Sequence, residues 1–274
     1  YLEKNGHFNI NQSGFRSQRN TIDQLLRLSD DVIKGLGNKS FVLGVFLDVE
    51  KAYDMIWKKG VLFKFHKLGL DGNIFNWVSA FLEGRSLQVR VGDSLSDTFQ
   101  VENGLPQGSV ISPILFLVAI NDLSPPNVKC SLFADDTAIW KTGKSVKHVQ
   151  SHIQNALNYI TKWCDMWGFK ISASKTSYVL FHRGKRKVMH LYLNDQELKS
   201  AKSVKFLGMI FDQRLTWKEH ILHLVEKCQK RINVLKLLTG SKWGADKETM
   251  IILYKTLIRS VLDYGCMIYG SASK

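Results

Sequence analysis

The chain has 274 residues, enough for one large hydrophobic core or for two domains. Its 38 Lys and Arg residues outnumber its 24 Asp and Glu residues, and the resulting formal charge of +14 favours polyanionic partners, with nucleic acid as the first candidate. Its four cysteines have no spacing typical of a zinc site or a disulfide framework, which indicates a reduced, intracellular setting, and no apolar run is long enough to span a membrane.

The first elements expected along the chain are a helix and a buried strand. Thr21 and Gln24 form a capping-box pattern, and the apolar periodicity that follows predicts an amphipathic helix that ends at Gly35 or Gly37. The apolar run 41–47 predicts a strand buried on both faces. Two helices are then expected around 61–68 and 74–82, followed by a hairpin that turns at Gly92-Asp93 and ends near Val101.

The second half of the chain continues the alternation and then becomes entirely helical. Ser112 and Pro113 favour the start of a helix over 114–123, and a strand then leads to Asp135. The apolar positions of 146–167 recur at helical spacing, which predicts a long helix packed on the sheet. Strand patterns return at 178–181, 191–193 and 206–211, and a helical pattern begins at Trp217. Mixed elements followed by helices alone suggest two units, residues 1–211 and 212–274.

Asp135 and Asp136 stand side by side at the crest of an otherwise apolar, strand-like segment. Adjacent carboxylates repel each other, and a turn between apolar strands hydrates them poorly unless a cation compensates their charge. Because Mg²⁺ takes one or two carboxylates together with substrate phosphates, this pair favours phosphoryl-transfer chemistry. An ordinary Asp-rich turn is the alternative.

A third acid, Asp48, directly follows the predicted strand 41–47. If this strand neighbours the one that leads to Asp135, the three carboxylates meet at one edge of a sheet and can hold two metal ions roughly 4 Å apart. Asp48 could instead cap a helix over residues 50–57.

Five sequence blocks resemble those of reverse transcriptases in both order and spacing. They are QSGFRSQRNT (12–21), DVEKAYD (48–54), LPQGS (105–109), FADD (133–136) and KFLG (205–208). The second to fourth resemble motifs A, B and C, the first resembles a block of the non-LTR retrotransposon branch, and the last resembles the primer grip. Each block alone is weakly specific, but their joint order is highly specific. The similarity covers essentially the whole chain, and a jockey-like element of an animal genome is the subtype it resembles.

The resemblance implies an α+β fold and a metal site. The fold would be a right-hand polymerase palm, an antiparallel sheet with packed helices, together with the remainder of the fingers and a helical thumb. Asp48, Asp135 and Asp136 would hold two Mg²⁺ ions, for which Mn²⁺ can substitute. The backbone carbonyl of Val49 would complete one coordination shell.

The same resemblance implies how a nucleotide would be bound. The backbone amides of Lys51 and Ala52 would donate to its triphosphate where a strand passes into a helix. The ring of Tyr53 would collide with a ribose 2′ hydroxyl and so favour deoxynucleotides, although without the motif Tyr53 would be read as a core residue. Gln107 would contact a template base, and Gly108 would let the backbone approach it closely.

Further residues are assigned by resemblance around this site. Lys175 would be the general acid for the pyrophosphate leaving group, with an exposed surface lysine as the alternative. Phe206, Leu207 and Gly208 would form the primer grip. Arg16 and Arg19 would lie in the fingers near the template, either contacting phosphate or exposed to solvent.

The basic excess is concentrated in two places. One is the run His182-Arg183-Gly184-Lys185-Arg186-Lys187, and the other is the set Lys227, Lys230, Arg231, Lys236 and Lys242. Such runs are commonly solvated surface, but here they accompany a polymerase signature.

The sequence therefore predicts an RNA-directed DNA polymerase of a mobile element. Its expected partners are an RNA template, a DNA primer or target DNA and deoxynucleotides, in a cytoplasmic ribonucleoprotein and the nucleus and without a membrane. Because the chain begins at Tyr1 and lacks the family's Arg-Pro-Ile block, we expect a polyprotein fragment, weak or inactive alone, whose further domains are missing. The alternatives are a degenerate RNA-binding copy and a two-metal nuclease, which would need neither Tyr53 nor the LPQG segment.

Overall fold

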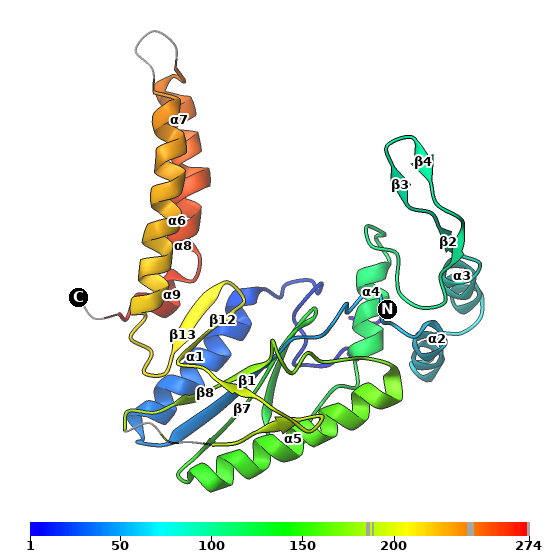
Figure 1. The fold of residues 1–274 in the computed structure, drawn as a ribbon, viewed down its shortest axis with the longest axis horizontal. Coiled ribbons are helices and arrows are strands. Elements are labelled where there is room, and N and C mark those ends of the chain that lie inside the picture. Colours follow the sequence, from blue (N-terminus) through cyan, green and yellow to red (C-terminus); the bar gives the residue numbers. More distant parts are fainter. Residues whose placement is uncertain (185–186, 188, 240–243, 273–274) are drawn as a thin grey trace.

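A five-stranded sheet forms the centre of the computed structural model, which describes residues 1–184, 187, 189–239 and 244–272 (Figure 1). The strands lie in the order β11 (Lys199–Ser200), β8 (Ser177–Phe181), β1 (Phe41–Leu47), β7 (Asp136–Gly143) and β6 (Lys129–Phe133). All neighbours are antiparallel except β11 and β8. The strand predicted at 41–47 is confirmed. Asp48, which follows β1, and Asp135 and Asp136, where β7 begins, are brought to one edge of the sheet.

The two faces of the sheet carry separate hydrophobic layers. Leu43, Val45 and Leu47 of β1 face the long helix α5 (Val146–Trp167), which occupies the predicted residues and runs beneath the sheet in Figure 1. Val42 and Phe46 face α1 (Thr21–Gly37) on the other side. This alternation follows from the two-residue period of a strand, and it explains why β1 is a continuous apolar run.

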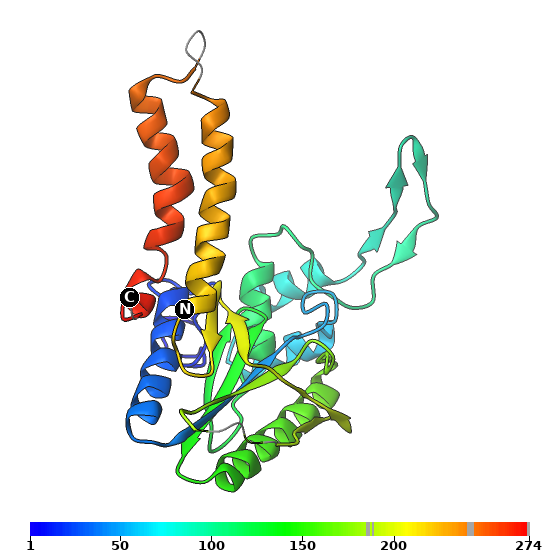
Figure 2. The ribbon, with the colours of Figure 1, turned by 60° about the vertical axis from the view of Figure 1, so that its left-hand side comes forward.

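The fingers side of the molecule contains short helices and an extended hairpin. Its elements are α2 (Lys58–Lys67), α3 (Asn73–Leu82), β2 (Ser86–Leu87), β3 (Arg90–Val91), β4 (Ser94–Leu95), β5 (Phe99–Gln100) and α4 (Ser112–Ile120). The hairpin projects away from the palm in both views (Figures 1 and 2). The predicted helices and the turn at Gly92-Asp93 are confirmed.

The C-terminal part begins with small strands and ends in a helical pair. Its elements are β9 (Tyr192–Leu193), β10 (Gln196–Glu197), β12 (Ser203–Phe206), β13 (Met209–Asp212), α6 (Lys218–Leu237), α7 (Lys247–Tyr254), the π-helical segment η1 (Lys255–Arg259), α8 (Ser260–Asp263) and α9 (Cys266–Tyr269). The long helix α6 and the returning helices stand side by side and project from the palm (Figure 2). A third apolar cluster joins them, with Leu224, Leu235 and Ile258 at its centre.

Two sequence predictions about these elements are wrong. Asn20, not Thr21, caps α1, because its side chain accepts from the amide of Asp23, whose carboxylate accepts from the Asn20 amide in turn. The stretch 206–211 is not one strand, because Leu207 and Gly208 have φ of 43° and 83° and form the turn between β12 and β13.

Three further expectations concern the chain as a whole. All four cysteines are free thiols. No helix among the described residues is both long and apolar enough to cross a bilayer. The basic residues Lys185, Arg186 and Lys242, singled out from the sequence, lie outside the described residues.

Candidate active site

Three acids meet at one edge of the central sheet. The pairing of β1 with β7 ends at Leu47 opposite Thr137, so Asp48 and Asp136, the next residues, face each other across the two strands. Phe133 pairs with Asp136, which leaves Ala134 and Asp135 as the turn between β6 and β7. The expectation that these two strands are neighbours is confirmed.

The electrostatics of this edge call for a cation. Burial raises the pKa of Asp136 above its ordinary value, and the negative charges of Asp135 and Asp48 raise it further. No three His, Cys, Asp or Glu side chains form a ready-made metal cluster in the part of the chain that the structure describes. Mg²⁺ commonly binds one or two carboxylates and completes its shell with substrate phosphates and water. An open edge of mutually repelling carboxylates therefore fits a divalent ion that binds together with its substrate.

The segment from Gln12 to Gly14 holds the acidic turn in place. Gln12 bridges to Leu132 of β6, and its buried Oε1 accepts from the amides of Gly14 at 2.7 Å and Ala134 at 3.3 Å. Ala134 has φ of 54°, a conformation that a non-glycine residue adopts at some cost. A Cβ on Gly14 would lie only 2.2 Å from the Ala134 amide nitrogen. The sequence analysis did not identify this support, because nothing in the spacing of 12–14 and 133–136 indicates contact.

Arg16 has a structural role that the sequence analysis did not consider. Its side chain is only 6% exposed, pairs with Glu3 at 2.7 Å, and donates to the carbonyl oxygens of Asn9 and Gln12. Solvent exposure therefore does not describe Arg16, whose guanidinium is bound by acceptors of the protein itself. Arg19 is half-buried and donates to the carbonyl of Ile10.

A pocket of about 500 Å³ opens beside Asp135. Its walls contain all six residues that the resemblance assigned to the nucleotide: Val49, Lys51, Ala52, Tyr53, Gln107 and Gly108. Four more residues complete the walls: Ser109, Val110, Ser112 and Pro113. The sequence analysis had read Ser112 and Pro113 only as a helix start. Residues from motifs A, B and C thus surround one space.

Tyr53 and the LPQG segment shape this pocket together. Tyr53 is half-buried and its ring stacks on Phe116, with centroids 4.9 Å apart and planes 12° from parallel. Its carbonyl accepts from the amide of Leu105 at 2.9 Å, and this bond joins the DVEKAYD segment to the LPQG segment. Burial, and then the charge of Asp135, raises the pKa of Tyr53, so its hydroxyl stays neutral at pH 7. Tyr53 therefore lines the pocket and also packs against the core, so both interpretations of this residue apply.

Gln107 is held by a residue of the DVEKAYD segment. Its Nε2 donates to Asp54 Oδ1 at 3.0 Å, while the residue stays exposed. Gly104 before it has φ of 89°, and a Cβ there would approach the Asp54 carbonyl oxygen to 2.8 Å. Glycine is needed at 104 for both reasons.

The segment after Asp48 is a series of turns, not a helix. Val49 bridges to Ile171, Lys51 has φ of 42°, and its carbonyl accepts from the amides of Asp54 and Met55. The next helix, α2, begins only at Lys58. The reading of Asp48 as a helix cap is therefore wrong, and so is the placement of the Lys51 and Ala52 amides at a strand-to-helix junction. Both amides are nevertheless left without a hydrogen bond to any described residue, in the pocket wall.

Lys175 lies beside the acids on a loop that braces Asp48. Its Nζ is 3.7 Å from Asp48 Oδ2, and the Lys175 side chain is 71% exposed. The carbonyl of Asp48 accepts from the amide of Ser172 at 2.9 Å, and its amide lies 3.3 Å from the Thr176 hydroxyl. The loop therefore places an ammonium group at the edge where the sequence analysis expected a proton donor.

The segment assigned to the primer grip forms the β12–β13 turn. Phe206 and Leu207 are buried, so their side chains pack against the palm, and only Gly208 is exposed. The Tyr264 hydroxyl donates to the Leu207 carbonyl at 2.6 Å and lies 3.0 Å from the Thr21 hydroxyl. One tyrosine thus links this turn to the first residue of α1.

Comparison with known proteins identifies the family. The family model described as reverse transcriptase (RNA-dependent DNA polymerase) matches residues 2–211. The chain belongs to the reverse transcriptase family. The chain is 29% identical over 96% of its length to the RNA-directed DNA polymerase from mobile element jockey of Drosophila melanogaster, and 27% identical over 99% to the probable polymerase from transposon X-element of that species. The predicted resemblance to jockey-like non-LTR elements is confirmed. The chain spans about 30% of the length of each of these relatives.

Solved structures share the fold. Apo telomerase from Candida tropicalis aligns with a TM-score of 0.53 at 12% identity, over 77% of this chain and 37% of that one. Telomerase from the same species in complex with a TWJ fragment of telomeric RNA aligns with a TM-score of 0.52 at 13% identity, over 94% of this chain and 43% of that one. The α+β right-hand polymerase fold predicted from the sequence is therefore confirmed.

Proposed function

We propose that the chain carries the catalytic centre of an RNA-directed DNA polymerase of a mobile element. The observation that supports this most directly is the pocket of about 500 Å³, in which residues of motifs A and B lie beside Asp135 of motif C. In the proposed reaction the primer 3′ oxygen bonds to the α-phosphorus of a deoxynucleoside triphosphate as the bond to pyrophosphate breaks. The 3′ hydroxyl loses its proton, and the leaving pyrophosphate gains one.

Asp48, Asp135, Asp136 and the carbonyl of Val49 would hold two Mg²⁺ ions, or Mn²⁺ in their place. When bound, such ions neutralise phosphate charge and align the attacking and leaving oxygens. The protein edge suits them because the three carboxylates repel one another and raise the pKa of Asp136.

The remaining residues position the nucleotide. The unpaired amides of Lys51 and Ala52 would donate to the triphosphate, since free N–H groups in a turn bind anionic oxygens. Tyr53 would lie under the sugar, and Gln107, held by Asp54, would contact a template base. Gly108, with φ of 90° and no atom within 4 Å of the position a Cβ would occupy, would let the template strand approach the backbone closely. Lys175 would protonate the pyrophosphate, and the Phe206–Gly208 turn would hold the primer end through its backbone.

The test is extension of a DNA primer on an RNA template with labelled deoxynucleotides, in Mg²⁺ and separately in Mn²⁺. Asp135→Asn should abolish extension and weaken Mn²⁺ binding measured by electron paramagnetic resonance, while leaving the fold intact. Asp93→Asn, at the tip of the fingers hairpin, is the matched control. Extension by the Asp135→Asn variant at the wild-type rate would refute the assignment, and inactivity of the wild type with normal RNA binding would favour a degenerate copy.

The proposed partners are an RNA template, a DNA primer or target DNA, and deoxynucleotides. The proposed location is a cytoplasmic ribonucleoprotein and the nucleus, where a mobile element's template and target are found.

A further inference from the structure

A basic hollow lies at the end of the palm sheet opposite to the acids. It measures about 440 Å³ and is bounded by the end of α1, the start of β1 and the residues that follow β8. Lys39, His182, Arg183 and Lys187 lie in its walls, and no Asp or Glu is among the described residues there. The seven residues of β1 separate it from Asp48, a distance of roughly 20 Å. The hollow is therefore distinct from the nucleotide pocket.

The cations around this hollow have no acidic partners in the part of the chain that the structure describes. Lys39, Arg183 and Lys187 form no ion pair with any described residue. Lys187 Nζ lies 4.8 Å from the centre of the Phe41 ring, which in turn lies 5.8 Å from the His182 ring. Like charges gathered around one concave surface repel one another and raise the local concentration of anions.

His182 adds an unsatisfied polar atom to the same wall. The residue is 6% exposed, and its Nδ1 is buried without a hydrogen-bond partner among the described residues. A Cβ on Gly184, another residue of the wall, would lie 3.5 Å from this nitrogen. Burial, and then the charges of Lys187 and Arg214, lowers the pKa of His182. A buried polar atom without a partner is costly, and a ligand oxygen would satisfy Nδ1 in the tautomer in which this nitrogen carries the proton.

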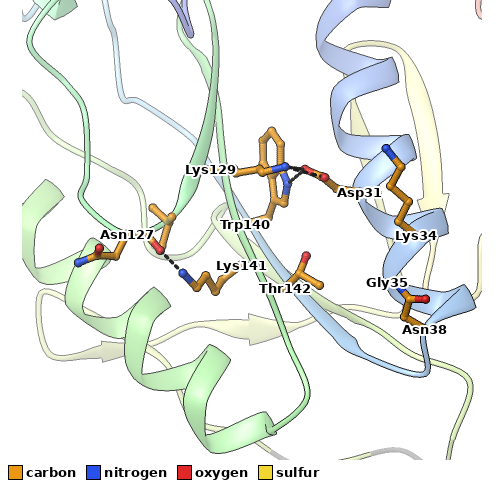
Figure 3. Close-up of a pocket in the computed structure, with 10 residues that line it drawn as sticks. Asp31, Lys34, Gly35, Asn38, Asn127, Lys129, Trp140, Lys141 and Thr142 are labelled. Atoms are coloured by element: carbon orange, nitrogen blue, oxygen red, sulfur yellow. Dashed lines mark hydrogen bonds and ion pairs between the residues drawn. The ribbon is translucent and has the colours of Figure 1, made fainter.

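A second hollow, shown in Figure 3, is the contrasting case. It measures about 410 Å³ and also contains three lysines, Lys34, Lys129 and Lys141. Each already has an acceptor: Lys34 contacts Asp30 at 2.5 Å, Lys129 contacts Asp31 at 2.7 Å, and Lys141 donates to the carbonyl of Asn127 at 2.7 Å. Asp31 also accepts from the indole of Trp140 at 2.7 Å. Basic side chains alone therefore do not define an anion site on this palm.

We propose that the hollow formed by Lys39, His182, Arg183 and Lys187 binds phosphodiester groups of a nucleic-acid strand that runs past the far end of the palm. Lysine and arginine side chains without an ion pair among the described residues are groups that phosphate oxygens accept from, and a phosphate oxygen can also accept from His182 Nδ1 in the tautomer that carries the proton there. This inference goes beyond the proposed function, because the hollow takes no part in nucleotide transfer. Lys185 and Arg186, in the same run, lie outside the described residues and stay unchanged in the variants below.

Two charge-matched double variants test the proposal. Arg183→Gln/Lys187→Gln removes two cations from the basic hollow, and Lys34→Gln/Lys141→Gln removes two from the hollow of Figure 3. Binding of labelled single-stranded RNA to the full chain is measured by fluorescence anisotropy over a range of salt concentrations. The first variant should weaken binding on the order of tenfold and reduce the slope of log K against log salt by about 1.4, or about 0.7 per lost phosphate contact. The second should stay close to the wild type.

Equal weakening by both variants would mean that only net charge matters, and no weakening of either RNA or DNA binding by the first variant would mean that the hollow binds no strand; either result overturns the proposal. His182→Phe keeps the ring packing on Phe41 but removes Nδ1, and it should weaken binding as well. Repeating the series with DNA of the same sequence shows which kind of strand occupies the hollow, because only binding of that strand should show the reduced salt slope in the first variant.

The experiment also separates this proposal from the proposed function. The binding comparison needs no catalysis, so it stays informative if the wild type fails to extend a primer. Where the wild type does extend, Arg183→Gln/Lys187→Gln should retain the rate of single-nucleotide addition at saturating primed template.

Discussion

Nζ of Lys175 lies 3.7 Å from Oδ2 of Asp48, so a candidate proton donor and a candidate metal ligand form an ion pair at the edge of the palm. Both side chains are exposed, 71% for Lys175 and 42% for Asp48, and such pairs contribute only about 0–1 kcal/mol to stability. The pair matters for its position and not for stability. A metal cation bound to Asp48 would displace Lys175, and the ammonium group of Lys175 would then be free to approach the leaving phosphates.

Replacing Lys175 should therefore affect catalysis and not folding. For Lys175→Ala we expect the rate of primer extension to fall by about 10²-fold or more, the usual contribution of a general acid, with the melting temperature unchanged. Lys175→Arg keeps the positive charge but cannot give up its proton near neutral pH, so it should be nearly as slow. Lys170→Ala, at an exposed lysine of the same loop, is the control. Full activity of Lys175→Arg would show that only charge is needed.

Asp136 should lower stability when it is ionised and no cation is bound. Because its pKa is raised in the folded protein, the folded state binds more protons than the unfolded state between the ordinary and the raised value. Stability therefore falls as pH rises through that window, and the loss is complete above it. We expect Asp136→Asn to raise the melting temperature at pH 7 in EDTA by a small amount, on the order of 1–3 °C, while abolishing extension. Mg²⁺ should stabilise the wild type and not the variant, and a melting temperature lowered by the substitution would contradict this account.

The elements of the palm were predictable because their patterns are local. The apolar run 41–47 and the helical spacing of apolar residues in 146–167 predict the bounds of β1 and α5. The position of Asp48 at the end of a strand follows from the first of these bounds. The six residues assigned to the nucleotide by resemblance all line one pocket.

The parts that sequence reasoning missed depend on contacts between distant segments. Gln12 reaches Ala134, and Tyr264 reaches Leu207 and Thr21, across more than fifty residues in each case. Neither periodicity nor motif spacing carries information about such pairs. The helix expected after Asp48 failed for a similar reason, because the bridge from Val49 to Ile171 and the contacts of 53–56 with 104–105 hold that segment in turns.

Tyr53 should govern the choice of sugar. Its ring lines the nucleotide pocket while stacking on Phe116, so the stack fixes its position. Tyr53→Val should open space beneath the sugar and reduce the preference for deoxynucleotides over ribonucleotides on the order of tenfold, measured as the ratio of kcat/KM values. Tyr53→Phe keeps the ring and should keep the preference. If Tyr53→Val discriminates as well as the wild type, the ring serves only packing.

Gly14 should be essential for the acidic turn because no side chain fits there. A Cβ would lie 2.2 Å from the Ala134 amide nitrogen, so Gly14→Ala must push the turn away from Gln12. We expect a loss of about 1–3 kcal/mol in the free energy of unfolding and a large loss of extension. Gly37→Ala is the matched control, since nothing lies within 4 Å of its Cβ and alanine favours the helix. Equal stability of the two variants would mean that the turn adapts and that Gln12 does not hold it.

Tyr264 should couple the proposed primer-grip turn to the body of the protein. Its hydroxyl donates to the Leu207 carbonyl and contacts Thr21, and Gly208 packs against its ring, where an added Cβ would lie 3.2 Å from Cε1. Tyr264→Phe keeps the ring but frees the turn, at a cost of about 1 kcal/mol in stability. Among the described residues no hydrogen bond joins Leu207 to the three acids, so addition of the first nucleotide should change little. The product length per binding event, measured with a trap that captures released enzyme, should shorten. Tyr254→Phe, at an exposed tyrosine of α7, should leave product length unchanged, and the same result for Tyr264→Phe would show that the turn holds its position without this bond.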